Sequence, residues 1–177
     1  MRNTVTLLAA AFVVCACAAP AQIASNKARD YDKQPQRLFV MTDIGSEWGN
    51  QYYNAFKAKT IALLSECGAA VEMSRINGLE LDEGVHLRRA RAFKSDAVLN
   101  IRMKSGTKNQ SGMYIAVDYD ARMTDVEAKK VVWRSSTHFT RGLTGFAERG
   151  EQLAIDVTNK MKQDGIFRSC AVVKTQP

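Results

Sequence analysis

The sequence of 177 residues is poor in proline, histidine and cysteine, with 3, 2 and 4 copies. This composition excludes a collagen-like chain, and four cysteines are too few for a dense disulfide scaffold. The Gly-x-Ser-x-Gly, His-Glu-x-x-His and phosphate-loop motifs are absent, as are paired zinc-binding cysteines. These absences remove the enzyme classes that a short motif identifies.

What the chain does contain is typical of a folded globular protein. Hydrophobic residues make up 46% and charged residues 24%, which excludes wholesale disorder. The length predicts one domain that is large enough to bury a core, but too small for an ordinary two-domain enzyme. Lys and Arg number 25 against 18 Asp and Glu, so the formal net charge is +7.

The first residues have the pattern of a secretory signal. Arg2 supplies a short basic region, and ten mainly apolar residues, 5–14, follow it. A membrane-spanning helix needs about 20 apolar residues, so the shorter run is typical of a signal peptide. The alternative is a buried N-terminal helix, which is disfavoured because the run has no polar face. Removal of residues 1–16 leaves 24 basic and 18 acidic residues, a net charge of +6.

The four residues Val14-Cys15-Ala16-Cys17 resemble the bacterial lipobox, in which a small residue precedes the lipidated cysteine. The resemblance implies lipidation of Cys17, although cysteine at position −2 departs from the pattern. Several acyl chains anchor a protein firmly, whereas one binds only marginally. The resemblance also implies the periplasmic face of the outer membrane, because Ala18 rather than Asp follows the cysteine. The alternative is ordinary cleavage after Ala18 or Ala21, which leaves a periplasmic or secreted protein.

The other two cysteines, Cys67 and Cys170, predict a disulfide, because an exported domain meets an oxidising compartment. Closing a loop of about 100 residues stabilises the fold by roughly 4–5 kcal/mol in the loop-entropy model. The alternative is two separately buried thiols. A metal site is not expected, since zinc needs three or four clustered ligands and His86 and His138 are far apart in sequence. No cofactor is expected either.

Hydrophobic periodicity predicts an α+β domain with the order β-α-β-α-β-β-β-α. The expected strands are 37–44, 70–76, 97–104, 113–123 and 130–140, and the expected helices are 48–66, 82–93 and 147–164. Residues 17–36 lack a sustained period and are expected to be a lipidated N-terminus and flexible tether. Residues 37–177 then form one domain: a mixed sheet of about five strands, helices on one face, and a more polar opposite face.

The second half of the chain resembles a known envelope fold. The segments that carry the resemblance are 95–101 (SDAVLNI), 118–121 (DYDA), 130–134 (KVVWR) and Leu153-Ala154. They are similar to the fold shared by the TolB amino-terminal domain, CsgG-type lipoproteins and LpoB-type lipoproteins, over residues 37–168. The resemblance implies a binding or assembly module in the cell envelope that has no catalytic residues. It does not include residues 43–48, which match no motif of that group.

The densest basic run is a candidate patch for an anionic ligand. Its members are Arg88, Arg89, Arg91 and Lys94. Lipid head groups, lipopolysaccharide or glycan phosphate would suit it, whereas nucleic acid is not expected as a partner of an exported protein. The alternative interpretation is a solvated helix face.

An aromatic cluster is a candidate patch for a protein partner. Trp48 precedes a predicted helix that carries Tyr52 and Tyr53, and an exposed cluster of this kind would be a contact surface. The alternative is that these rings pack into the core.

Asp118 and Asp120, two residues apart on one strand face, are candidates for metal or acid–base chemistry together with His138. The alternative, which we favour, is a solvated sheet face on which they oppose Arg102, Arg122 or Arg134. We therefore expect a non-catalytic envelope lipoprotein with a membrane anchor and a protein partner. A small periplasmic hydrolase or metal-dependent enzyme and a self-associating structural component remain the alternatives.

Overall fold

The computed structural model describes residues 21–82, 84–142 and 144–170. The strands are β1 (Gln22–Lys27), β2 (Arg37–Thr42), β3 (Ala70–Arg75), β4 (Ala97–Lys108), β5 (Tyr114–Asp125) and β6 (Lys130–Thr140). The helices are α1 (Gly49–Ser65), α2 (Val85–Ala92) and α3 (Phe146–Gln163). The signal region and Cys17 lie outside the described residues.

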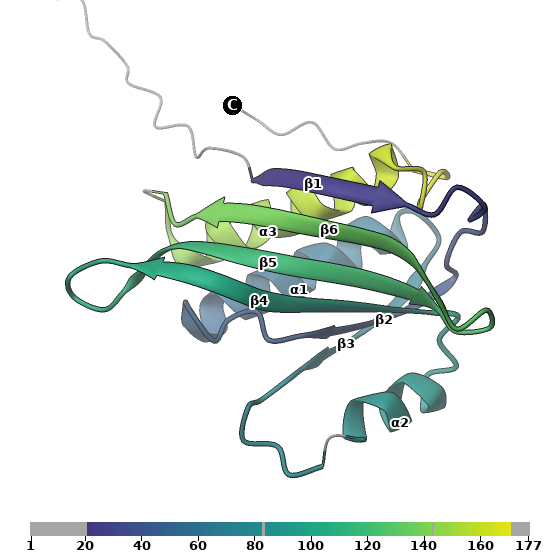
Figure 1. Cartoon of the computed structure of the whole chain (residues 1–177), viewed down its shortest axis with the longest axis horizontal. Helices are drawn as coiled ribbons and strands as arrows, with labels where there is room; N and C mark the ends of the chain where they lie inside the picture. Colours follow the sequence, from purple (N-terminus) through teal and green to yellow (C-terminus); the bar gives the residue numbers. More distant parts are fainter. Residues whose placement is uncertain (1–20, 83, 143, 171–177) are drawn as a thin grey trace, which may run out of the picture.

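The six strands form one mixed sheet in the order β1-β6-β5-β4-β2-β3 (Figure 1). Strand β2 pairs in parallel with both β3 and β4, because α1 and α2 carry the chain back between these strands. Strands β4, β5, β6 and β1 pair antiparallel. The fold is therefore of the α+β class that the sequence predicts.

The first strand lies inside the segment that the sequence analysis assigned to a flexible tether. Strand β1 pairs with β6 over its whole length, from Gln22 opposite His138 to Lys27 opposite Trp133. The Ala21 amide donates to Asp156 in α3 at 2.8 Å. Only alternate residues of β1 are half-buried, so its hydrophobic signal is weak and its partner strand supplies most of its stabilisation. The ordered sheet thus begins at residue 22 rather than 37 and has six strands.

Helices α1 and α3 pack side by side on one face of the sheet, behind the strands in Figure 1. The core between them contains Leu38 and Val40 of β2, Tyr52 and Phe56 of α1, and Leu153 of α3. Cys67, just after α1, is joined to Cys170, beyond α3, by a disulfide across 103 residues. The covalent link therefore connects the two helices that form the main layer.

Helix α2 covers the opposite face of the sheet, which differs from the prediction of helices on one face. Phe39 alternates with the core residues of β2, so its ring points away from α1 and contacts Phe93 at 6.4 Å between centroids. Ser74 of β3 likewise contacts His86 of α2 at 2.8 Å. Two apolar faces on the central strand β2 require a cover on each side. No helix in the described part of the chain is long and apolar enough to cross a membrane.

Candidate binding face

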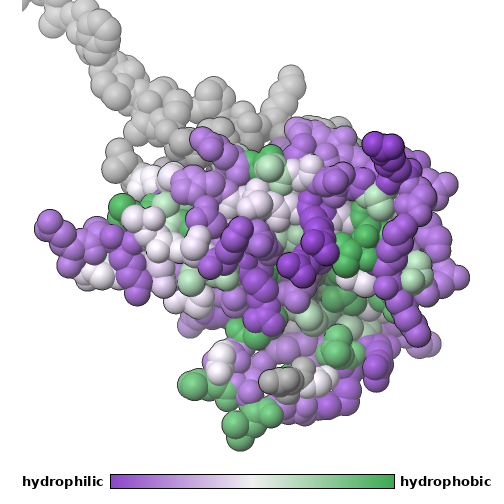
Figure 2. Space-filling view, viewed as in Figure 1, coloured by the Kyte–Doolittle hydropathy of each residue, from purple (hydrophilic) through white to green (hydrophobic). Residues whose placement is uncertain are grey.

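Helix α2 covers only the β2–β3 end of its face, and the rest of that face is solvent-exposed in the described residues. Residues of β4, β5, β6 and β1 whose side chains point away from α1 and α3 form what we call the open face. On β5, Val117, Tyr119 and Ala121 are buried in the core, so Asp118, Asp120 and Arg122 point the other way. Figure 2, viewed onto the open face, shows mainly hydrophilic side chains there.

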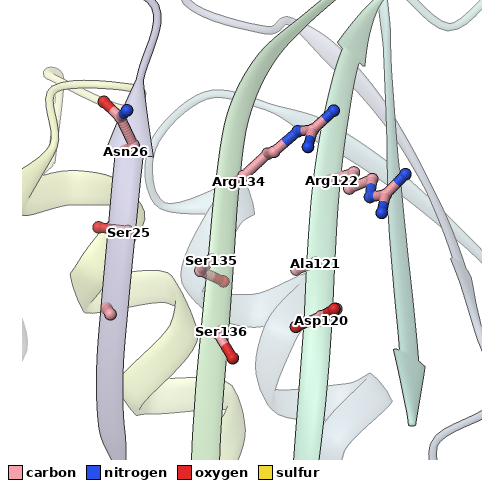
Figure 3. A pocket seen from close by; sticks show the side chains of 9 residues that line it. Ser25, Asn26, Asp120, Ala121, Arg122, Arg134, Ser135 and Ser136 are labelled. Atoms are coloured by element: carbon pink, nitrogen blue, oxygen red, sulfur yellow. The ribbon is translucent and has the colours of Figure 1, made fainter. Parts of the chain in front are cut away.

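Two arginines lie directly opposite each other in the middle of the open face. Arg122 of β5 is in register with Arg134 of β6. Asn26 of β1 lies beside Arg134, and Asn100 of β4 lies beside Arg122. These four residues form a line across four strands, which we call the arginine row. Figure 3 shows both guanidinium groups turned the same way, each reaching toward the next strand.

Two shallow hollows adjoin the arginine row. One, of about 360 Å³, is lined by Asn26, Arg134, Arg122, Asp120 and Ser136 among others. The second, of about 270 Å³, lies over β4 and is lined by Asn100, Arg102 and Lys104 as well as Asp120 and Arg122. Both hollows are lined by Arg122 and Asp120, so they are neighbours on the open face.

The second line of residues on the open face is Arg102, Asp120 and Ser136, in register on β4, β5 and β6. Asp120 therefore opposes an arginine, as the sequence analysis predicted for a solvated face. Arg122 and Arg134, in contrast, oppose each other rather than a carboxylate. Like charges directly opposite each other destabilise a sheet, so this pairing has no structural benefit of its own.

Asp118 and His138 meet at the edge of this face. His138 Nδ1 lies 2.7 Å from Asp118, and the Ser105 hydroxyl donates to the other carboxylate oxygen at 2.6 Å. The hydrogen bonds from Ser105 and then His138 lower the pKa of Asp118. The carboxylate is thus the central member of the three, whereas a serine-nucleophile triad places the histidine in the centre. The described residues contain no cluster of three His, Cys, Asp or Glu suited to a metal ion.

His86 is buried and has two partners that the sequence did not reveal. Its Nδ1 lies 2.8 Å from the Ser74 hydroxyl, and its Nε2 lies 2.5 Å from Glu80. Ser74 is only 1% exposed and also accepts a hydrogen bond from Arg89 at 2.7 Å. A substrate has no access to this serine, so the chain of hydrogen bonds fastens α2 to β3.

The basic run on α2 is partly neutralised by neighbouring acids. Arg88 is bound to Asp82, and Arg89 to Glu72 at 2.9 Å. Arg91 and Lys94 are exposed. The run is therefore a weaker anionic-ligand candidate than the four cationic residues suggested.

The aromatic patch expected at Trp48, Tyr52 and Tyr53 is not on the surface, and that interpretation was wrong. Their exposed fractions are 6%, 0% and 9%. Trp48 packs edge-on against Tyr52 at 4.9 Å and donates its indole N–H to the Tyr114 carbonyl at 2.9 Å. The same three-to-four spacing that predicted helix α1 directs its aromatic stripe into the core.

The most exposed large apolar residues lie elsewhere, on α2 and in the loop before it. Leu79 is 85%, Leu81 101% and Leu87 50% exposed. Figure 2 shows hydrophobic groups projecting from the lower left of the molecule, where Figure 1 places the loop between β3 and α2. The sequence does not reveal this patch, because Leu79 and Leu81 lie in a loop, which has no hydrophobic period.

The comparisons with known proteins place the fold. No family model matches the chain, and no curated protein matches its sequence. The L103M PelC dodecamer from Paraburkholderia phytofirmans has a TM-score of 0.52 at 14% identity, covering 78% of this chain and 96% of that chain. A second PelC dodecamer structure has a TM-score of 0.50, with the same identity and 78% and 95% coverage.

A third solved structure is the lipoprotein GNA1162 from Neisseria meningitidis, with a TM-score of 0.43 at 20% identity and coverage of 73% and 99%. The resemblance to TolB, CsgG and LpoB that the sequence suggests stays a prediction. At such low identities the PelC superpositions concern backbone architecture alone. The chain thus shares an α+β fold with PelC.

Proposed function

We propose that this protein is an exported envelope lipoprotein whose folded domain is a non-catalytic binding module. The open face is its binding surface. One observation carries the proposal: four adjacent strands present polar side chains around two neighbouring hollows, and no described helix covers them. The opposite face is fully used by α1 and α3. A solvated face of this extent, held by a rigid sheet, suits recognition of a partner or polymer.

Four further features support the proposal. The signal pattern and lipobox resemblance of residues 1–17 support export and anchoring, and the Cys67–Cys170 disulfide suits an oxidising compartment. The central position of Asp118 between Ser105 and His138 supports a role without nucleophilic catalysis. The TolB, CsgG and LpoB resemblance supports an envelope location.

Site-specific photocrosslinking in intact cells tests the binding surface. A photoreactive amino acid at Ser136, exposed on the open face, is compared with one at Asn54, exposed on α1. We expect a discrete adduct from position 136 that position 54 does not give. Identical adduct patterns, or none from position 136, would refute the open face as the binding surface.

Self-association is the second candidate, and the leucine patch favours it. Leu79 and Leu81 lie in the loop that follows β3, an edge strand of the sheet, and Leu87 lies on α2. Exposed apolar residues and a free strand edge both favour protein contacts. PelC, which shares the fold, is described as a dodecamer. Sedimentation velocity of the Leu81→Asp variant tests this candidate, with Val126→Asp as control because Val126 is also exposed, at 42%. A monomeric wild type overturns self-association, as does an oligomer that Leu81→Asp leaves intact.

A further inference from the structure

We propose that the arginine row binds an acidic glycan, with its carboxylate or phosphate groups held between Arg122 and Arg134. This inference rests on the proposed function, since it assigns a ligand to the open face. The shared chemistry is a chain of sugars that carries repeated anionic groups. Guanidinium groups recognise both carboxylate and phosphate in a bidentate manner.

The first argument is the charge arrangement of the two arginines. They are directly opposed, and neither forms an ion pair within the described part of the chain. Arg88 and Arg89, in contrast, each have a carboxylate partner. An anion between Arg122 and Arg134 turns their mutual repulsion into two favourable contacts. The protein thus presents a preformed site that lacks only its counter-charge.

The second argument is the shape of the site. The arginine row crosses four strands, and neighbouring strands are about 4.8 Å apart, so its three steps span about 14 Å. Asn26 and Asn100 at the two ends add amide groups that can donate and accept hydrogen bonds. Asn100 Oδ1 already accepts one from Arg102 Nε at 3.1 Å, which holds this amide in place. Hydroxyl groups on sugar rings need such partners, whereas an isolated small anion does not fill a row of this length. The two neighbouring hollows beside the row give room for sugar rings.

The third argument concerns the acidic groups on the same face. Asp118 is engaged by Ser105 and His138, and Asp120 opposes Arg102. Four cations, Arg102, Lys104, Arg122 and Arg134, therefore outnumber two carboxylates. Because Asp120 adjoins Arg122 along β5, it repels an anion from the second line of residues. The ligand is thus directed to the arginine row rather than spread over the sheet.

Isothermal titration of the purified mature domain tests the proposal. The carboxylate probe is an oligogalacturonate, the phosphate probe is phosphomannan, and dextran is the neutral control. We expect the wild type to bind at least one acidic probe and to ignore dextran. The double variant Arg122→Gln/Arg134→Gln should weaken binding tenfold or more, and Arg122→Lys should weaken it in part because a lysine cannot form the bidentate contact.

The matched control is Arg29→Gln/Arg168→Gln, which removes the same charge from two exposed arginines outside both the open face and the basic run of α2. We expect it to change affinity by less than twofold. Equal losses in both double variants indicate non-specific attraction and overturn the proposal, as does a wild type that binds neither acidic probe. The probe that binds tighter identifies the anionic group. A discrete crosslink from position 136 without acidic-glycan binding would overturn this inference while leaving the proposed function intact.

Discussion

Gly150 of α3 lies directly against the backbone carbonyl oxygen of Tyr52 in α1. A Cβ at Gly150 would overlap that oxygen and also approach the Phe56 amide to 3.1 Å. Glycine is needed at this position because a residue with a side chain would not fit, and not because the backbone angles are unusual. This contact lets α1 and α3 approach closely enough to form one layer behind the sheet.

The substitution Gly150→Ala is therefore expected to destabilise the fold. The added methyl group meets rigid backbone and forces the two helices apart, at a cost of about 1–3 kcal/mol. Urea denaturation measures the change in unfolding free energy. Gly78→Ala is the control, because nothing lies within 4 Å of a Cβ built at Gly78. Equal stability of the two variants would contradict the close approach.

The disulfide is expected to contribute a large share of the stability. Replacing Cys67 and Cys170 together by serine releases a loop closed across 103 residues. The loop-entropy model predicts a loss of roughly 4–5 kcal/mol. Denaturation of the wild type with and without a reducing agent should show the same loss, and the double variant should not respond to the reductant. Free thiols in freshly prepared periplasmic protein would count against the bridge.

Stability is expected to fall in alkali as Tyr31 ionises. Its side chain is 7% exposed, and its burial, followed by the charges of Asp125 and Asp96, raises its pKa to about 12. A raised pKa in the folded state means that the stabilisation is complete below pH 10 and is lost as the pH rises through 12. Tyr31→Phe should flatten this loss by up to about 1.4 kcal/mol per pH unit. Unfolding free energies at pH 7, 10 and 11.5 provide the measurement, and an unchanged slope would remove Tyr31 as the cause.

Cys17→Ser is expected to abolish lipidation and release the protein from the membrane fraction, whereas Cys15→Ser should leave it there. Cell fractionation and intact mass of the mature protein provide the measurements. A wild-type N-terminus at Ala19 or Gln22 without acyl mass contradicts the anchor and supports ordinary cleavage.

Alternation along β5 was sufficient to predict which residues share a face. Tyr119 and Ala121 are buried as expected, and Asp118, Asp120 and Arg122 point outward together. Successive residues of a strand point to opposite faces of the sheet, so a period of two in the sequence shows which residues share a face. The same reasoning failed for β1, because a short strand of small polar residues depends on β6 for its stability.

The arginine row could not be predicted from the sequence, for a different reason. The sequence offered Arg102, Arg122 or Arg134 as partners of the aspartates, and of these Arg102 opposes Asp120, whereas the mutual pairing of Arg122 and Arg134 was not predicted. Cross-strand register depends on turns and bulges, and β5 and β6 shift register between Met123 and Thr124. Trp48 illustrates a third limit of the sequence. Aromatic residues on one side of a helix have the same spacing whether they face a protein partner or the core.

The pairing of β1 with β6 also limits the length of chain that would join a lipid on Cys17 to the folded domain. Only residues 18–20 separate Cys17 from Ala21, whose amide is already fastened to α3 through Asp156. Four residues of extended chain span at most about 14 Å. A lipid on Cys17 would therefore hold the domain close to the bilayer, attached through the β1 edge of its sheet. The open face would then bind its ligands near the membrane surface rather than deep in the periplasm.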